Sequence, residues 1–125
     1  MEECLFCKWK NEKEKVIFEN ELAFARYDEF AVSPGHMLFI TKRHCKDFFE
    51  ATLEEKNAIF ELIEIAKKMI DEKYNPDGYN IGMNCGIAAG QSVMHVHVHL
   101  IPRYKGDVEN PRGGVRGVIP KKQSY

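Results

Sequence analysis

Three histidines alternate with valines in the run His95-Val96-His97-Val98-His99. In an extended strand, residues two apart lie on one face, about 6.6 Å from each other, so the three imidazoles are expected to form a row above buried aliphatic side chains. A neutral imidazole can attack phosphorus near neutral pH and be displaced later by water. His-x-His on a strand also binds zinc at hydrolytic centres. The row alone is therefore equally compatible with a nucleophile and with a metal site.

The loop before this row favours phosphate chemistry. Ala89-Gly90-Gln91-Ser92 leads directly into the histidine run. Small residues allow a phosphate to approach backbone N–H groups, and Gln91 and Ser92 add neutral hydrogen-bond donors. Ordinary turn formation is the alternative explanation for this composition.

A second group that could do chemistry is Cys4-Leu5-Phe6-Cys7. Two thiolates at this spacing can bind one tetrahedral zinc ion together with two further ligands. The pair could also be a redox couple or a coincidence. Cys45 and Cys85 have no partner pattern, so we expect both to be inert.

The elements that must position these groups indicate an α+β fold, a mostly antiparallel sheet of about five strands with one long helix packed on it. The helix begins at a capping box, Thr52 to Glu55, and carries apolar residues at helical spacing as far as Ile70. Strands are expected at residues 16–18, 22–27, 37–40, 79–83 and 94–101.

Bulk properties limit the function classes. The 125 residues fit one domain, and a net charge of −1 is not that of a polycation that coats nucleic acid. From Arg103 onward six basic and two acidic residues give a basic tail, which suits an anionic substrate or simply keeps the tail solvated. The absence of a long apolar stretch and the acidic N-terminus predict a cytoplasmic protein without a membrane partner.

The stretch from Gln91 to Arg103 resembles the signature of the histidine triad (HIT) family, in which histidines alternate with apolar residues. Pro34-Gly35-His36 before an apolar strand resembles an earlier motif of that family, and the similarity extends from Cys4 to about Arg103. Residues 110–120 resemble the C-terminal segment of the prokaryotic diadenosine polyphosphate hydrolase (fragile-histidine-triad-like) branch. The resemblance implies a single HIT domain over residues 1–125, with a basic tail at about 104–125.

The resemblance also implies roles for the histidine row and its loop. The middle histidine, His97, would attack the α-phosphorus and form a nucleotidyl-histidine intermediate. His99 would lie against the phosphates, and His95 would complete the row. Gln91 and Ser92 would hold phosphate and leaving-group oxygens.

Further roles follow for residues outside the row. Asp28 occupies the position that binds the ribose hydroxyls, and His36 would support the row from behind. Phe6 and the strand that begins at Met37 would line the base pocket. Arg112 and Arg116 could contact a long polyphosphate or a neighbouring subunit.

Some family members complete the Cys-x-x-Cys site with two histidines, which correspond here to His44 and His95. The implied cofactor is therefore a structural zinc ion bound by Cys4, Cys7, His44 and His95. The implied activity is hydrolysis or nucleotidyl transfer at the α-phosphate of diadenosine polyphosphates or related nucleotides, by a homodimer. A nucleoside phosphoramidase, a nucleotide-binding regulatory module and a plain zinc hydrolase remain alternatives.

Overall fold

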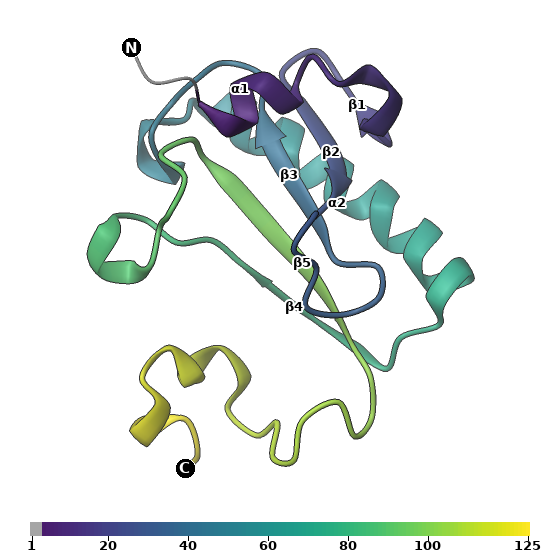
Figure 1. Ribbon diagram of the computed structural model, residues 1–125, viewed down its shortest axis with the longest axis vertical. Coiled ribbons are helices and arrows are strands. Elements are labelled where there is room, and N and C mark those ends of the chain that lie inside the picture. Colours follow the sequence, from purple (N-terminus) through teal and green to yellow (C-terminus); the bar gives the residue numbers. More distant parts are fainter. Residues whose placement is uncertain (1–3) are drawn as a thin grey trace.

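The computed structural model describes residues 4–125, and the acidic opening of the chain at residues 1–3 lies outside them. Five antiparallel strands form one sheet in the order β1-β2-β3-β5-β4, with one long helix across it (Figure 1). The strands are β1 (Phe18–Glu19), β2 (Ala23–Tyr27), β3 (Met37–Thr41), β4 (Gly78–Gly82) and β5 (His97–Arg103). The α+β fold predicted from the sequence is confirmed.

The two central strands, β3 and β5, divide their side chains between the two faces of the sheet. Leu38 lies opposite His99, and Ile40 lies opposite His97. Because alternate residues face opposite ways, Phe39 and Val98 point to the other face and join the larger core there. The face that carries His97 and His99 is thereby kept free of the long helix.

The long helix α2 (Leu53–Tyr74) begins at the predicted capping box, where Thr52 accepts from Glu55 N–H and Glu55 accepts from Thr52 N–H. Its apolar residues cover the sheet face opposite the histidines; they are Ala58, Ile59, Leu62, Ile63, Ala66 and Ile70. The helix ends at Asn75, which adopts the left-handed conformation with φ of 51°. None of the helices in residues 4–125 has the length and apolar character needed to cross a membrane.

A short helix that the sequence pattern did not predict, α1 (Leu5–Trp9), covers the histidine face. Phe6 and Trp9 are buried against Phe24, Leu38 and Ile40. The sheet is therefore covered on both faces near β3, by α2 on one side and by α1 on the other (Figure 1).

The expected strand at 94–101 is wrong at its start, because β5 begins only at His97. Before it, His95 N–H donates to the Val93 carbonyl at 2.9 Å, and Val96 N–H donates to the Cys45 carbonyl at 2.8 Å. These bonds replace the strand ladder, so His95 does not continue the row and instead turns toward the N-terminal cysteines. The remaining strand predictions differ from the structure mainly by one or two residues at their ends.

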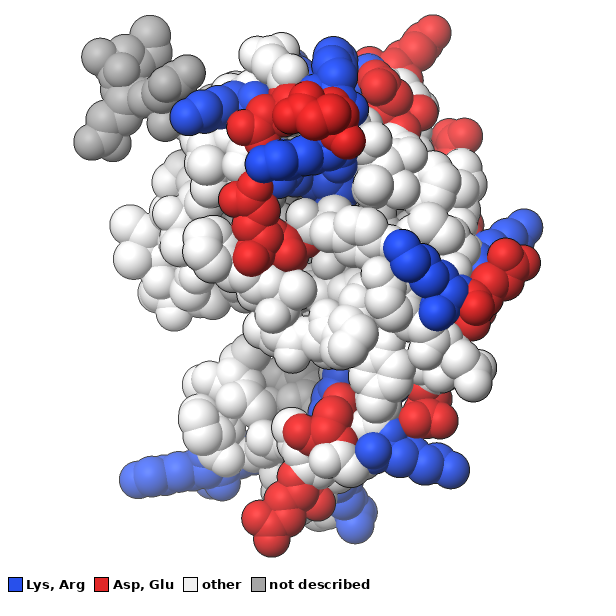
Figure 2. All heavy atoms as spheres, turned by 45° about the vertical axis from the view of Figure 1, so that its right-hand side comes forward, with Lys and Arg blue, Asp and Glu red and all other residues white. Residues whose placement is uncertain are grey.

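The chain after β5 folds back beside β4 and contains two 3₁₀ turns, η4 (Gly114–Val118) and η5 (Pro120–Lys122). It forms the lower part of the molecule in Figure 1. Figure 2 shows basic and acidic side chains interspersed along the edges of the face in view, with uncharged residues between them.

Glu55 links the start of α2 to the loop after β3. Its carboxylate accepts from Arg43 at 3.0 and 2.8 Å and from Thr52 N–H at 2.9 Å. The Arg43 guanidinium, more than any other group, lowers the pKa of Glu55, and the Glu55 side chain is only 4% exposed.

We predict that Glu55→Gln lowers the free energy of unfolding by about 1–3 kcal/mol, because charge-assisted bonds to a buried carboxylate are lost. Urea unfolding at neutral pH measures the change. Glu54→Gln on the same turn is the control, since Glu54 is exposed and should change stability by less than about 0.5 kcal/mol. Equal effects of the two substitutions would contradict this role for Glu55.

Candidate active site

His97 is held in one tautomer by the backbone. Its Nδ1 lies 2.8 Å from the carbonyl oxygen of His95. A carbonyl only accepts, so Nδ1 carries the hydrogen and Nε2 keeps a free electron pair. Burial lowers the pKa of His97, against a smaller opposing effect of the hydrogen bond to His95. The ring of Phe6 packs edge-on at 4.7 Å between centroids and limits its rotation. These contacts present a neutral, fixed imidazole whose Nε2 can act as a nucleophile.

A hydrogen-bonded chain behind His97 fixes the tautomer of His99. Val32 N–H donates to Nδ1 of His36 at 3.1 Å, so Nε2 of His36 carries its hydrogen. That nitrogen lies 2.9 Å from Nδ1 of His99, which must therefore accept. His99 is left with an Nε2–H donor. Burial, followed by the charges of His97 and His36, lowers the pKa of His99 to about 4, so this donor is neutral at neutral pH.

Asp28 lies beside this chain. Its Oδ2 is 3.5 Å from Nε2 of His36, and its Oδ1 accepts from Phe30 N–H at 2.8 Å. Burial nevertheless lowers the pKa of His36 because it outweighs the opposing effect of the Asp28 charge. The carboxylate therefore faces neutral imidazoles.

His97, His99, Asp28 and Ser92 line one cavity of about 310 Å³. The remaining wall is mainly apolar and consists of Leu5, Phe6, Trp9, Phe30, Leu38 and Val93, with Asn84 as a polar member. A cavity of this kind suits a ligand with a planar apolar part and an anionic part. The expected contribution of the Met37 strand comes from Leu38, while Met37 itself packs in the core under α2.

Gln91 and Ser92 are placed differently. Ser92 lines the cavity, whereas Gln91 is buried in the loop. The Gln91 Oε1 accepts from Gly86 N–H at 2.8 Å, and its Nε2 donates to the carbonyls of Lys46 at 2.6 Å and Val93 at 3.1 Å. In this structure Gln91 therefore holds the loop together, and the loop presents Ser92.

Cys4, Cys7, His44 and His95 converge next to the histidine cavity, with their ligand atoms all within 4.8 Å of one another. His95 Nδ1 lies 3.4 Å from Cys4 Sγ and 3.5 Å from Cys7 Sγ, and His44 Nδ1 lies 3.3 Å from Cys7 Sγ. Ligand atoms around tetrahedral zinc are separated by roughly 3.3–3.8 Å, given the usual Zn–S and Zn–N distances. The donor set and its spacing therefore fit zinc.

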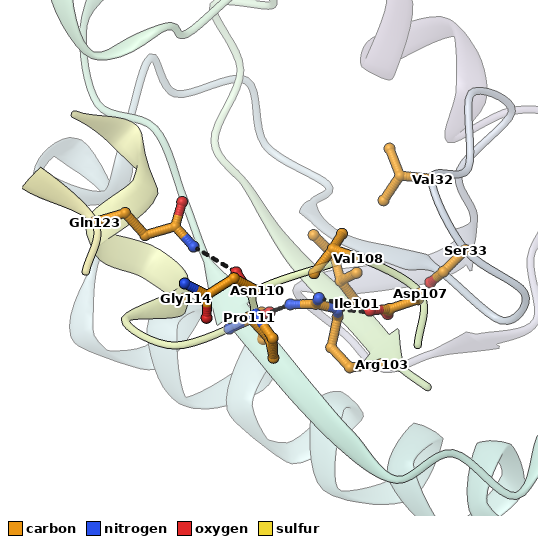
Figure 3. Close-up of a pocket in the computed structure, with 11 residues that line it drawn as sticks. Val32, Ser33, Ile101, Arg103, Asp107, Val108, Asn110, Pro111, Gly114 and Gln123 are labelled. Atoms are coloured by element: carbon orange, nitrogen blue, oxygen red, sulfur yellow. Dashed lines mark hydrogen bonds and ion pairs between the residues drawn. The ribbon is translucent and has the colours of Figure 1, made fainter. Parts of the chain in front are cut away.

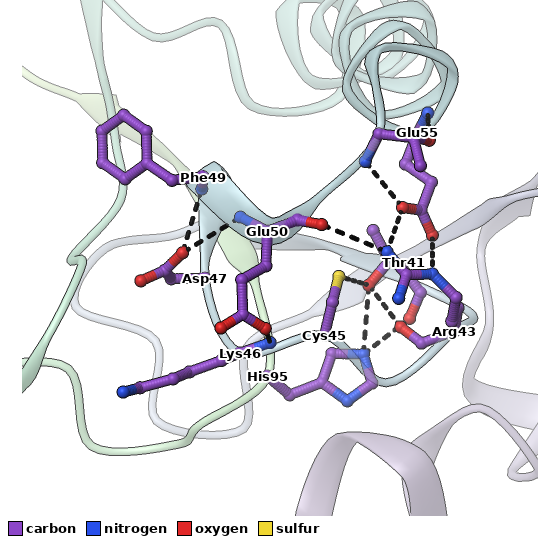
Figure 4. A network of polar contacts seen from close by, with 10 residues as sticks. Thr41, Arg43, Cys45, Lys46, Asp47, Phe49, Glu50, Glu55 and His95 are labelled. Carbon is purple, nitrogen blue, oxygen red and sulfur yellow. Dashed lines mark hydrogen bonds and ion pairs between the residues drawn. The ribbon is translucent and has the colours of Figure 1, made fainter.

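The second nitrogen of His95 is also fixed. Its Nε2 lies 2.7 Å from the Thr41 carbonyl oxygen, so Nε2 carries the hydrogen and Nδ1 is free to bind a metal. Figure 4 shows this bond within a network that continues through the Thr41 hydroxyl to the Arg43 carbonyl and through Arg43 to Glu55. His95, the proposed zinc-binding residue, is thus connected by hydrogen bonds to the residues that cap α2.

Residues 10–106 match the HIT domain family. The chain belongs to this family. It is 41% identical to an uncharacterised HIT-like protein of Methanocaldococcus jannaschii over 85% of this chain and 83% of that protein. It is 35% identical to the bis(5'-adenosyl)-triphosphatase of Dictyostelium discoideum, over 84% of this chain and 70% of the enzyme.

Two solved structures show the same HIT fold. A HIT family protein from Bacillus anthracis has a TM-score of 0.79 and 37% identity, over 85% of this chain and 77% of that one. A zinc-bound histidine triad protein from Mycobacterium smegmatis has a TM-score of 0.74 and 31% identity, over 83% and 77% of the two chains.

The sequence analysis did not assign five residues to the wall of the cavity that holds His97, namely Leu5, Trp9, Phe30, Asn84 and Val93. Trp9 lies three positions after Phe6, a spacing that puts both on one helix face and could have revealed it. The guanidinium carbon of the buried Arg26 lies 3.8 Å from the Trp9 ring centroid. Arg26 is held in turn by Glu12 at 2.9 Å and Glu29 at 2.8 Å. Asn84 carried no local signal, because only the pairing of β4 with β5 brings it to the histidines.

Arg112 and Arg116 of the tail do not line the cavity that holds His97, and neither do Cys45 and Cys85. Arg116 donates to the carbonyls of Lys122 and Gln123, and both Arg112 and Arg116 stack on the ring of Tyr125. Burial raises the pKa of the Cys45 thiol, which agrees with an inert role.

The shifted pKa of His99 predicts a pH-dependent stability. The folded chain holds this pKa at about 4, below its ordinary 6.5, so the unfolded chain binds one more proton between these values. The His99 contribution should be complete above about pH 6.5 and decrease as the pH falls toward 4, by up to about 1.4 kcal/mol per pH unit. Urea unfolding across this pH range should therefore show that the free energy of unfolding falls more steeply with decreasing pH in the wild type than in His99→Asn. Parallel curves would show that His99 does not carry the effect.

Proposed function

We propose that this chain is a nucleotide hydrolase or nucleotidyl transferase that acts at the α-phosphate of diadenosine polyphosphates or related nucleotides through a covalent nucleotidyl-His97 intermediate. The observation that carries the proposal is the His97 Nδ1–H bond to the His95 carbonyl, which leaves Nε2 free in a cavity that also contains Ser92 and His99. The similarity to a bis(5'-adenosyl)-triphosphatase supports it.

In the first step Nε2 of His97 attacks the α-phosphorus, a P–N bond forms, and the P–O bond to the leaving phosphate breaks. The leaving polyphosphate is already an anion and needs no proton. The Nε2–H of His99 and the hydroxyl of Ser92 stabilise the charge that develops on the phosphate oxygens. The imidazole becomes cationic, and the hydrogen bond from its Nδ1 to the His95 carbonyl opposes the cost of that charge in a buried site.

In the second step water attacks the same phosphorus and the P–N bond breaks. The electron pair returns to Nε2 of His97, and the water proton leaves to solvent. Asp28 binds the ribose hydroxyls as acceptor, and the apolar wall with Phe6 holds the base. Gln91 acts by positioning Ser92, and His36 acts by orienting His99.

A nucleoside phosphoramidase would use the same nucleophile, but its amine leaving group would require a proton. The segment 110–125 carries four basic and no acidic residues, which favours a polyphosphate leaving group. Comparing kcat/KM for diadenosine polyphosphates and adenosine phosphoramidate separates these activities from each other. Absence of turnover on either would favour a nucleotide-binding regulatory module.

The proposed cofactor is one structural zinc ion held by Cys4, Cys7, His44 and His95. Four protein ligands complete a tetrahedral site and leave no position for a reactive water, so the chemistry remains with His97. We also propose that the whole chain acts as one HIT unit, as a homodimer in the cytoplasm.

His97→Asn should reduce turnover at least a thousandfold while nucleotide binding is retained, because among the residues that line the described cavity the free electron pair of an imidazole Nε2 belongs to His97. Rates and the Kd for a nonhydrolysable nucleotide are the measurements. The wild type, but not the variant, should become covalently labelled when mixed rapidly with substrate. A variant that keeps more than about a tenth of the wild-type rate would exclude His97 as the nucleophile.

Cys4→Ser should lower the metal content and the Tm strongly, because zinc binding is coupled to folding. Metal analysis of protein purified without added zinc, together with thermal unfolding, measures both. Cys85→Ser is the matched control and should change neither, since Cys85 lies outside the cluster. Metal that is lost on His97 substitution but kept in Cys4→Ser would contradict the assignment.

A further inference from the structure

A second cavity, of about 480 Å³, lies between β4, the end of β5 and the tail lobe, which we define as residues 110–125. Its apolar lining consists of Val32, Ile81, Met83, Ile101, Val115 and Val118. The space-filling view shows a hollow between the main body and the lower part of the molecule (Figure 2). Figure 3 shows the adjoining part of the groove, where Val32, Ile101 and Gly114 line the space around Arg103.

The second cavity meets the first at two residues. His99 and Asn84 line both of them. His97, the proposed nucleophile, lines only the first cavity, and its ring centroid lies 5.2 Å from that of His99. The two cavities therefore border each other at His99 and Asn84, on either side of the proposed reaction centre.

The tail lobe forms a fixed wall because it is closed on itself. Gln123 Nε2 donates to the carbonyls of Arg112 at 3.3 Å and Asn110 at 3.5 Å. Arg116 donates to the carbonyls of Lys122 at 3.0 Å and Gln123 at 3.3 Å. Gly113 has φ of +90°, and a Cβ there would overlap the Gln123 carbonyl oxygen. The lobe is thus organised before a ligand arrives, which reduces the entropy lost on binding.

On the β4 side of the cavity Asn80 is held in place, because its Oδ1 accepts from Arg103 at 2.6 Å. Arg103 lies in the adjoining part of the groove and donates to Asp107 at 2.7 and 2.8 Å (Figure 3). Asn80 and Asn84 add amide groups to a lining that is otherwise largely apolar. A planar ring with polar edges satisfies both kinds of surface.

We propose that the second cavity binds the leaving nucleoside of a dinucleoside polyphosphate, with the polyphosphate crossing His99 between the two cavities. This inference rests on the proposed function. When His97 displaces the α-phosphate oxygen, the second cavity holds the departing nucleoside polyphosphate in line with Nε2. Binding energy from this remote half lowers the barrier at the phosphorus.

The test compares two substrates that have the same attacked nucleoside and four phosphates, namely diadenosine tetraphosphate and adenosine 5'-tetraphosphate. Val118→Trp places a bulky side chain at the second cavity. Because Val118 is 73% exposed, the fold should tolerate this change. Ile119→Trp is the matched control, since Ile119 is 59% exposed and is not part of the lining.

We expect Val118→Trp to lower kcat/KM for the dinucleotide roughly tenfold or more, as loss of one base-stacking site does, and to leave the mononucleotide within about twofold. Ile119→Trp should leave both unchanged. If Val118→Trp affects both substrates equally or neither, the second nucleoside site is wrong while the proposed function stands. If the wild type cleaves neither substrate nor any other nucleotide, the proposed function itself fails.

Discussion

The hydrogen bond from His97 Nδ1 to the His95 carbonyl, 2.8 Å long, is the constraint on which the site depends. It selects the tautomer in which Nε2 keeps a free electron pair, and in the proposed reaction it would stabilise the positive charge on this ring. The carbonyl stays in place because the side chain of the same residue is fixed on both ring nitrogens, by Thr41 on one and by the cysteine cluster on the other. His95 thereby links the proposed zinc site, which its side chain meets, to the proposed nucleophile, which its backbone carbonyl holds.

The tautomer of His99 is fixed in the same way as that of His97, by the order of hydrogen-bond donors and acceptors next to it. A backbone N–H can only donate, so Val32 determines the hydrogen position on His36, and His36 determines it on His99. The donor-to-acceptor direction of these hydrogen bonds is therefore set by a backbone group that does not titrate. Burial keeps the imidazoles neutral, and the site therefore offers one free electron pair and one neutral donor side by side.

Local patterns predicted the parts of the structure that local physics determines. The capping box, the apolar period of α2 and the alternation of residues 97–100 in β5 are set by neighbouring residues, and the structure has all three. The late start of β5 was not predicted, because one of the bonds that replace the strand ladder joins Val96 to the carbonyl of Cys45, which is distant in sequence. Asn84 reaches the histidines only through the order of the strands. Gln91 illustrates a further limit, since composition identifies a polar loop residue but not whether its amide turns inward.

Helix α1 has only five residues, far fewer than an isolated helix needs to persist in water. It carries Cys7 of the cluster and also Phe6 and Trp9 of the cavity wall. The proposed zinc would therefore determine what fraction of molecules has a complete wall, and the apparent nucleotide affinity would scale with that fraction. By linkage, nucleotide would tighten zinc binding by the same factor, so that metal supply and substrate recognition would form one coupled equilibrium.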